Sequence, residues 1–279
     1  MNTEFQLRPS PIAGTWYSAN PKTLGAQIDD FLAQVEIPAI TGRVIGLVSP
    51  HAGYRYSGRT AAYAYKTVQG KSFDIVVVVS PLHGYVPAAI LTSAHSGYQT
   101  PLGEVLLEQS LLTEFSDLLT EKYQLRLTRI ADDDEHSLEI QLPFLQVVLG
   151  CFSFIPIVMG EQNAETCREL AEVIGQVAKD RHVLVAASSD LSHFHDYKKA
   201  TQMDGRILQH IQDDDVEGLL DNLADDKVEA CGGGPIVVMM IASHKLGARH
   251  TLLLNYANSG DVTGDKSSVV GYASAVCYR

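Results

Sequence analysis

The sequence predicts an α/β fold: a three-layer sandwich in which helices cover both faces of a central, mostly parallel or mixed sheet. Short runs rich in β-branched residues, such as RVIGLVS and FDIVVVVS, have the composition of buried strands. Segments with helical periodicity alternate with these runs along the whole chain, as is typical of α/β proteins. No low-complexity linker divides the 279 residues, so we expect one domain spanning 1–279.

Each element is predicted from its local pattern. Strands are expected near residues 43–49, 73–80, 87–93, 125–130, 153–159, 182–188, 251–257 and 268–277. The first helix is predicted by five apolar residues that share one helical face, Leu24, Ile28, Phe31, Leu32 and Val35. Further helices are expected near 57–69, 107–121, 138–149, 163–179, 198–213 and 235–246. The second and third strands follow each other too closely for an intervening helix, so some antiparallel pairing is expected.

The composition argues against several classes of protein. The formal net charge of −12 and the lack of a basic stripe argue against a nucleic-acid partner. No apolar stretch approaches the ~20 residues that span a bilayer, so no membrane partner is expected. The N-terminal segment lacks the basic and apolar regions of a signal peptide. None of the four cysteines forms a C-x-x-C pair, and free thiols in a cytoplasmic protein are the expectation.

Three segments share one pattern, an apolar strand followed by a sharp polar turn and a histidine. They are RVIGLVSPH, FDIVVVVSPLH and HVLVAASSDLSH, which end at His51, His83 and His193. Ligands of open α/β sheets bind beyond the carboxyl ends of the strands. Histidine is the commonest metal ligand and a general acid or base near neutral pH. The repeated pattern therefore predicts one convergent site.

Two further polar residues, Asp190 and Cys231, are candidates for the same site. Asp190 in SSDLSH either orients the imidazole of His193 or caps a turn. Cys231 opens ACGGGP, directly ahead of an apolar helix that has Pro235 in its first turn. A helix N-terminus lowers the pKa of a nearby thiol, so we expect Cys231 to be the most thiolate-like of the cysteines. The alternative is a buried cysteine at a tight packing point.

Four residues are candidates for contacts with a substrate. Tyr54 follows His51 in PHAGYRYSG and either lines a pocket or forms an aromatic lid. Glu135 and His136 in DDDEHSLE either line the site or belong to a solvated loop. Trp16 lies on an N-terminal arm that is too short to form its own core, so its ring must pack on the main domain. There it either covers a hydrophobic spot or roofs the pocket.

The chain resembles the Memo family, whose bacterial and archaeal members are labelled AmmeMemoRadiSam system protein B. The resemblance runs nearly end to end through AGTWY, PHAGYRYSG, SPLHG, TPLGE, DDEHSLEIQLPFL, SSDLSH, CGGGP and VVGYAS. The family is similar to the class III extradiol dioxygenases, which implies their fold and a non-haem metal site. By this resemblance His51 and His83 match the two histidine ligands. Cys231 stands where the dioxygenases have a glutamate, and His193 matches their acid/base.

The resemblance also implies a binding role for part of the site. In the animal members of the family, a cleft implicated in binding phosphotyrosine peptides is lined by residues that match Trp16, Tyr54, Asp190 and His193. A cleft of this kind would accept a small-molecule or a peptide ligand.

The leading hypothesis is a metal-binding protein with redox or dioxygenase-like chemistry on a small substrate. Iron or copper is the expected metal, with zinc as a third candidate, held by His51, His83 and Cys231. His193, oriented by Asp190, would move protons. The expected substrate contacts are Trp16, Tyr54, Glu135 and His136.

Two alternatives use the same residues differently. In the first, the cleft binds a peptide or a small anion without turnover. In the second, Cys231 is the nucleophile of a cysteine-based enzyme and His193 is its base.

Overall fold

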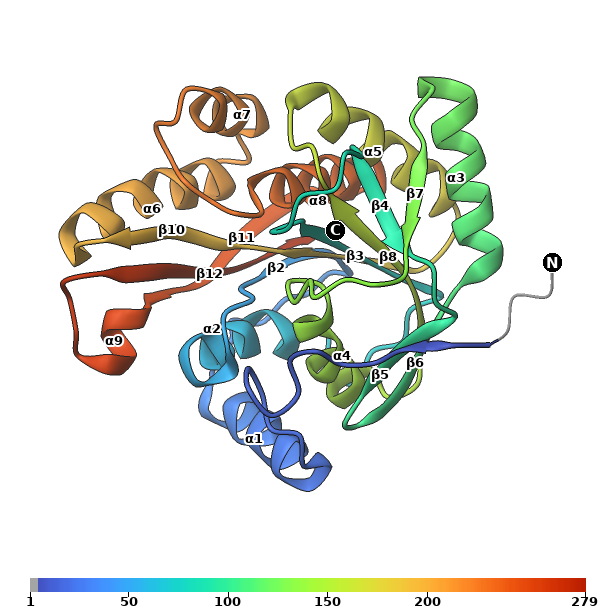
Figure 1. The fold of residues 1–279 in the computed structure, drawn as a ribbon. Coiled ribbons are helices and arrows are strands. Elements are labelled where there is room, and N and C mark those ends of the chain that lie inside the picture. Colours follow the sequence, from blue (N-terminus) through green and yellow to red (C-terminus); the bar gives the residue numbers. More distant parts are fainter. Residues whose placement is uncertain (1–4) are drawn as a thin grey trace.

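The protein forms one large sheet flanked by helices, in a computed structural model that describes residues 5–279 (Figure 1). The strands are β1 (Leu7–Arg8), β2 (Val44–Ser49), β3 (Ile75–Pro81), β4 (Ile90–Ser93), β5 (Gly97–Thr100), β6 (Gly103–Leu107), β7 (Leu127–Ile130), β8 (Ser153–Met159), β9 (Val183–Ser188), β10 (Asp190–His195), β11 (His250–Asn258) and β12 (Val269–Tyr278).

The helices are distributed along the whole described chain. They are α1 (Pro21–Gln34), α2 (Tyr54–Lys66), α3 (Gln109–Tyr123), the 3-10 helix η1 (Glu139–Gln141), α4 (Leu142–Leu149), α5 (Ala164–Val177), α6 (Tyr197–Gln212), α7 (Val216–Ala224), α8 (Gly233–Lys245) and α9 (Ser259–Thr263). None of the helices within residues 5–279 is long and apolar enough to cross a membrane.

The sheet is mixed, as the sequence predicts. Its centre is four neighbouring parallel strands in the order β8–β3–β9–β2. Beyond β2 the sheet continues with β12, which pairs antiparallel with β2, β10 and β11. At the other side β6 is parallel to β8 and forms an antiparallel hairpin with β5. The antiparallel partner of β4 is β8 rather than the preceding strand β3.

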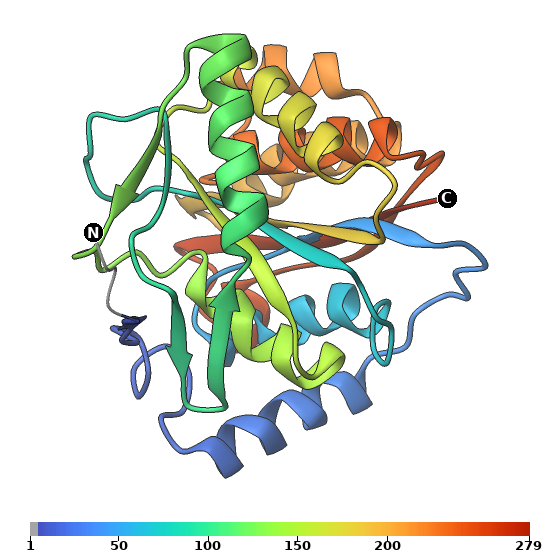
Figure 2. The ribbon, with the colours of Figure 1, turned by 90° about the vertical axis from the view of Figure 1, so that its right-hand side faces the viewer.

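Helices cover both faces of the sheet, which confirms the predicted three layers. Helices α1, α2 and α4 lie on one face, and α3, α5 and α8 lie on the other (Figures 1 and 2). Every residue of β2, β3 and β9 is buried, because these central strands are covered on both sides. The carboxyl ends of these three adjacent strands are the part of the fold that positions the candidate site.

The structure contains elements that the sequence pattern does not predict. They are β1, the β5–β6 hairpin, β10, α7 and α9. Helix α2 begins at Tyr54, earlier than the expected residue 57, with Gly53 as its N-cap. The helix expected over 138–149 is divided into η1 and α4, with Pro143 in the first turn of α4. Proline suits that position because it has no backbone N–H to leave unpaired.

Candidate metal centre and cleft

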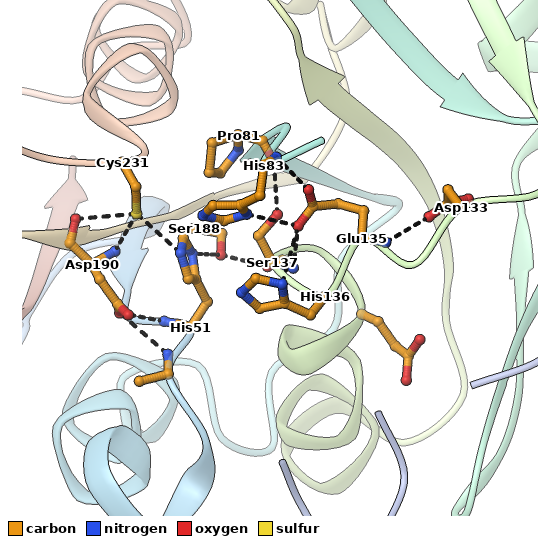
Figure 3. Close-up of polar contacts among 12 residues, drawn as sticks. His51, Pro81, His83, Asp133, Glu135, His136, Ser137, Ser188, Asp190 and Cys231 are labelled. Carbon is orange, nitrogen blue, oxygen red and sulfur yellow. Dashed lines mark hydrogen bonds and ion pairs between the residues drawn. The ribbon is translucent and has the colours of Figure 1, made fainter. Parts of the chain in front are cut away.

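Three histidines from different parts of the chain converge at the carboxyl edge of the central strands (Figure 3). His51 follows β2, His83 follows β3, and His136 lies between β7 and η1. One ring nitrogen from each lies within 4.8 Å of the others, close enough for a group that could hold a metal ion. Strand β9 separates β2 from β3 in the sheet, so the first two histidines approach across the end of β9.

The hydrogen bonds of His51 determine its tautomer. Its Nδ1 lies 2.9 Å from Ser188 Oγ, at the end of β9. That hydroxyl donates its only proton to the Ser137 carbonyl at 2.5 Å and accepts from the Gln141 side-chain amide at 2.8 Å. Because the hydroxyl proton is used, His51 must donate from Nδ1. Its Nε2 therefore presents a lone pair to the site, the form in which imidazole binds a metal.

Glu135 fixes His83 in the same way. Glu135 Oε1 lies 3.0 Å from His83 Nδ1, and its Oε2 accepts from the His83 backbone N–H at 2.6 Å. Burial alone would raise the pKa of Glu135, but the hydrogen bonds from His83 and from the Ser137 N–H hold it well below its usual range. The same hydrogen bond between the Glu135 and His83 side chains raises the pKa of His83. A carboxylate on the Nδ1 of a histidine orients Nε2 toward a metal and increases its basicity. Glu135 contacts His83 and lies outside the lining of the cleft.

Cys231 lies beside His51, two residues before α8, and is not among the three residues whose ligand atoms all lie within 4.8 Å of one another. Its Sγ is 3.0 Å from His51 Nε2, and the Asp190 backbone N–H donates to it at 3.3 Å. Burial, reinforced by the nearby Asp190 carboxylate, raises the pKa of the Cys231 thiol well above its ordinary value. The expected thiolate character is therefore wrong for the metal-free protein, because desolvation outweighs the helix N-terminus.

The three histidine rings are oriented differently relative to one another. The rings of His51 and His83 meet edge to face at 87°, with centroids 5.2 Å apart. The rings of His83 and His136 are stacked at 23°, with centroids 4.6 Å apart. Lone pairs of ring nitrogens lie in the ring plane, so two stacked rings aim them nearly side by side. One of these two rings would have to turn before both could bind the same ion.

Asp190 and His193 both line the cleft. The hydrogen-bond partners of the Asp190 carboxylate are backbone N–H groups rather than the His193 imidazole. Asp190 Oδ1 accepts the backbone N–H groups of His51 at 2.8 Å and Ala52 at 3.3 Å. It thus holds the turn after β2 rather than the His193 imidazole. Burial raises the pKa of Asp190 to about 7. Burial also lowers the pKa of His193, which favours its neutral form.

The N-terminal arm packs over one wall of the site. Trp16 lies against His136, with ring centroids 4.1 Å apart, and its carbonyl accepts the Tyr54 backbone N–H at 2.9 Å. Tyr54 itself is buried, and its hydroxyl donates to the Ile140 carbonyl at 2.8 Å. Trp16 therefore lines the cleft, whereas Tyr54 supports it from the core.

A cleft of about 830 Å³ opens onto the site. Seventeen described residues line it: Thr15, Trp16, His51, Ala52, Gly53, Tyr56, His83, His136, Asp190, His193, Phe194, Ser259, Thr263, Asp265, Ser268, Val270 and Tyr272. Tyr56, Phe194, Tyr272 and the segment around α9 were not predicted from the sequence as site residues. Of these, Tyr56 lies in PHAGYRYSG and Tyr272 in VVGYAS, two motifs that carry the family resemblance.

The fold and these contacts define an α/β protein with a histidine-rich candidate metal centre at the edge of its sheet. A family model described as Memo-like protein matches residues 8–276. A MEMO1 family protein of Nitrosopumilus maritimus is 33% identical over 273 residues, covering 96% of this chain and 98% of the relative. Another, of Methanopyrus kandleri, is 35% identical over 289 residues, covering 98% and 99%. The chain therefore belongs to the Memo family.

The fold is also similar to that of a solved structure. The crystal structure of an uncharacterized Escherichia coli K12 protein, JW3007, matches with a TM-score of 0.53 at 13% identity. The match covers 83% of this chain and 99% of that chain.

Proposed function

We propose that this protein binds a first-row transition metal through His51, His83 and Cys231, and uses it in redox or dioxygenase-like chemistry on a small substrate. The observation that carries the proposal is the pair of fixed tautomers. Ser188 and Glu135 engage the Nδ1 atoms, so both Nε2 lone pairs are left for a ligand. Metal-binding histidines commonly have such a partner on the second nitrogen.

The donor set fits a borderline or soft cation. Two neutral imidazoles and a thiolate suit copper, iron and zinc better than magnesium or calcium. The raised pKa of the Cys231 thiol is consistent with this role, because a bound cation is what removes the proton from a buried ligating thiol. A bound iron or copper ion would supply redox chemistry, whereas zinc would supply a Lewis acid.

The residues around the metal centre have separate roles in the proposal. His193 lines the cleft and, as a neutral imidazole, would accept or return a substrate proton. Asp190 would keep the turn that carries His51 in place. Trp16 and His136, whose rings lie against each other at an angle of 34°, would form the wall against which the substrate lies. The cysteine-nucleophile alternative is less well supported, because burial disfavours the thiolate of Cys231 in the absence of a cation.

Metal content tests the proposal. Protein purified anaerobically and loaded with iron, copper or zinc is assayed by plasma mass spectrometry. We expect about one metal per chain in the wild type and in His136→Ala. We expect a loss of metal in His51→Ala, His83→Ala and Cys231→Ser.

Cys151→Ser is the matched control, because Cys151 is exposed and lies outside the cleft. Circular dichroism of each variant reports whether the fold is retained. Metal retained in folded Cys231→Ser but lost in His136→Ala would replace the proposed ligand set with three histidines. A wild type that takes up none of the three metals would refute the proposal.

A further inference from the structure

Phe194 combines two properties that a residue without a role in binding rarely has. Its backbone φ is +61°, in the left-handed region that a bulky residue seldom adopts. Its side chain is 77% exposed, so packing of the ring in the protein does not offset this strain. Strained backbone persists only where the surroundings impose it, and such positions are enriched at ligand sites.

The strain belongs to a bulge in β10. The register between β10 and β12 shifts on both sides of His193. Consecutive residues of a regular strand point to opposite faces of the sheet. His193 and Phe194 nevertheless both line the cleft. The bulge thus delivers two adjacent side chains to the same cavity.

A buried carboxylate supports the bulge. Asp204 of α6 has no exposed surface, and its Oδ1 accepts the Ser192 backbone N–H at 2.9 Å. Its Oδ2 accepts the Tyr256 hydroxyl at 2.7 Å. The facing residue on β12 is Gly271, where a Cβ atom would lie 2.1 Å from Asp204 Oδ2. Because burying a carboxylate is costly unless it is hydrogen-bonded, this arrangement is a specific support for the bulge.

The cleft that Phe194 faces has a definite chemical character. Among its seventeen described lining residues there is no lysine or arginine, and two, Asp190 and Asp265, are acidic. Four are aromatic side chains other than histidine: Trp16, Tyr56, Phe194 and Tyr272. An anionic ligand would therefore find no lysine or arginine side chain among these residues. A flat uncharged ring, by contrast, would find aromatic faces to pack against.

We infer that Phe194 is a specificity-determining residue, and that its ring binds the uncharged aromatic part of a small substrate. The inference rests on the proposed function only in placing the reacting part of the substrate at the metal centre. Binding of the aromatic ring by Phe194 does not require the metal. It also argues against the anion-binding alternative.

Binding of 2-naphthol, measured by isothermal titration calorimetry on metal-free protein, tests the inference. Aromatic contacts of this kind change affinity by about 2–10-fold. We expect Phe194→Ala and Phe194→Gly to weaken binding by that factor. We expect the anion 2-naphthoate to bind the wild type more weakly than 2-naphthol does. Phe5→Ala is the control, because Phe5 is also exposed, at 63%, and lies outside the cleft.

Thermal unfolding of the same variants separates strain from binding. Glycine accepts positive φ without steric cost, so Phe194→Gly should melt higher than Phe194→Ala although both bind 2-naphthol weakly. No binding of 2-naphthol by the wild type, unchanged affinity in Phe194→Ala, or tighter binding of 2-naphthoate would each overturn the inference. Because the protein is metal-free, these outcomes are independent of the metal contents measured above.

Discussion

Replacing Arg8 by methionine tests the buried ion-pair network that holds the loop before η1. The Arg8 guanidinium contacts Glu139 Oε2 and Asp133 Oδ1, each at 2.6 Å, and donates to the Glu135 carbonyl at 2.8 Å. The side chains of Arg8 and Glu139 are 2% and 1% exposed. Methionine would fill much of the volume of Arg8 but would leave Glu139 buried without its cation.

Removing one partner of a buried ion pair typically costs about 3–5 kcal/mol. Burial raises the pKa of Glu139 even beside Arg8, so in the variant this carboxyl group can fold in its neutral form. That places the expected loss near the lower limit, about 3 kcal/mol of unfolding free energy. A group with a raised folded-state pKa stabilises the protein at low pH and loses that contribution as pH rises through this pKa. The deficit of Arg8→Met should therefore be larger at pH 8 than at pH 5.

Urea denaturation of wild type and variants at both pH values measures this deficit. Arg168→Met is the matched control, since its ion pair with Glu217 is exposed, at 48% and 70%, and should cost less than about 1 kcal/mol. The double variant Arg8→Met/Glu139→Gln should recover part of the loss. If Arg8→Met loses no more stability than Arg168→Met, the network does not hold the loop in the way described.

Three further predictions concern the site and its support. Glu135→Gln should weaken zinc binding about 10–100-fold in a competition titration, because the histidine it holds loses a charged acceptor; equal affinity would contradict its positioning role. Iodoacetamide should label exposed Cys151 before half-buried Cys231, whose thiol pKa is raised, in metal-free protein, and mass spectrometry of the peptides would reveal the opposite order. Gly271→Ala should destabilise the protein by about 1–3 kcal/mol, because its methyl group meets Asp204; an unchanged melting temperature would show that the bulge tolerates the added volume.

The central strands and two of the site histidines were predictable from the sequence. Uniformly apolar, β-branched runs identify buried strands, and each ends in a turn that carries His51 or His83. The order of the strands in the sheet brings these turns together. This agrees with the rule that ligands of open α/β sheets bind beyond the carboxyl ends of the strands. By contrast, SSDLSH reads as a polar turn, yet β10 begins at Asp190, because it pairs with β12 far along the chain.

The remaining features depend on contacts that a sequence pattern does not encode. The burial of Cys231 reverses the pKa shift expected from its place before α8. Glu135 points at His83 rather than into the cleft, because the turn before η1 brings it there. The exposure of Phe194 follows from a bulge held by Asp204, and no local signal in the sequence marks it.

The X-ray absorption spectrum of the zinc-loaded protein tests the central claim most directly. If His51, His83 and Cys231 hold the metal, the fitted shell contains one sulfur at about 2.3 Å and at least two nitrogens at about 2.0–2.1 Å. The sulfur contribution disappears in Cys231→Ser. A shell of nitrogen and oxygen alone in the wild type would contradict the proposed ligand set.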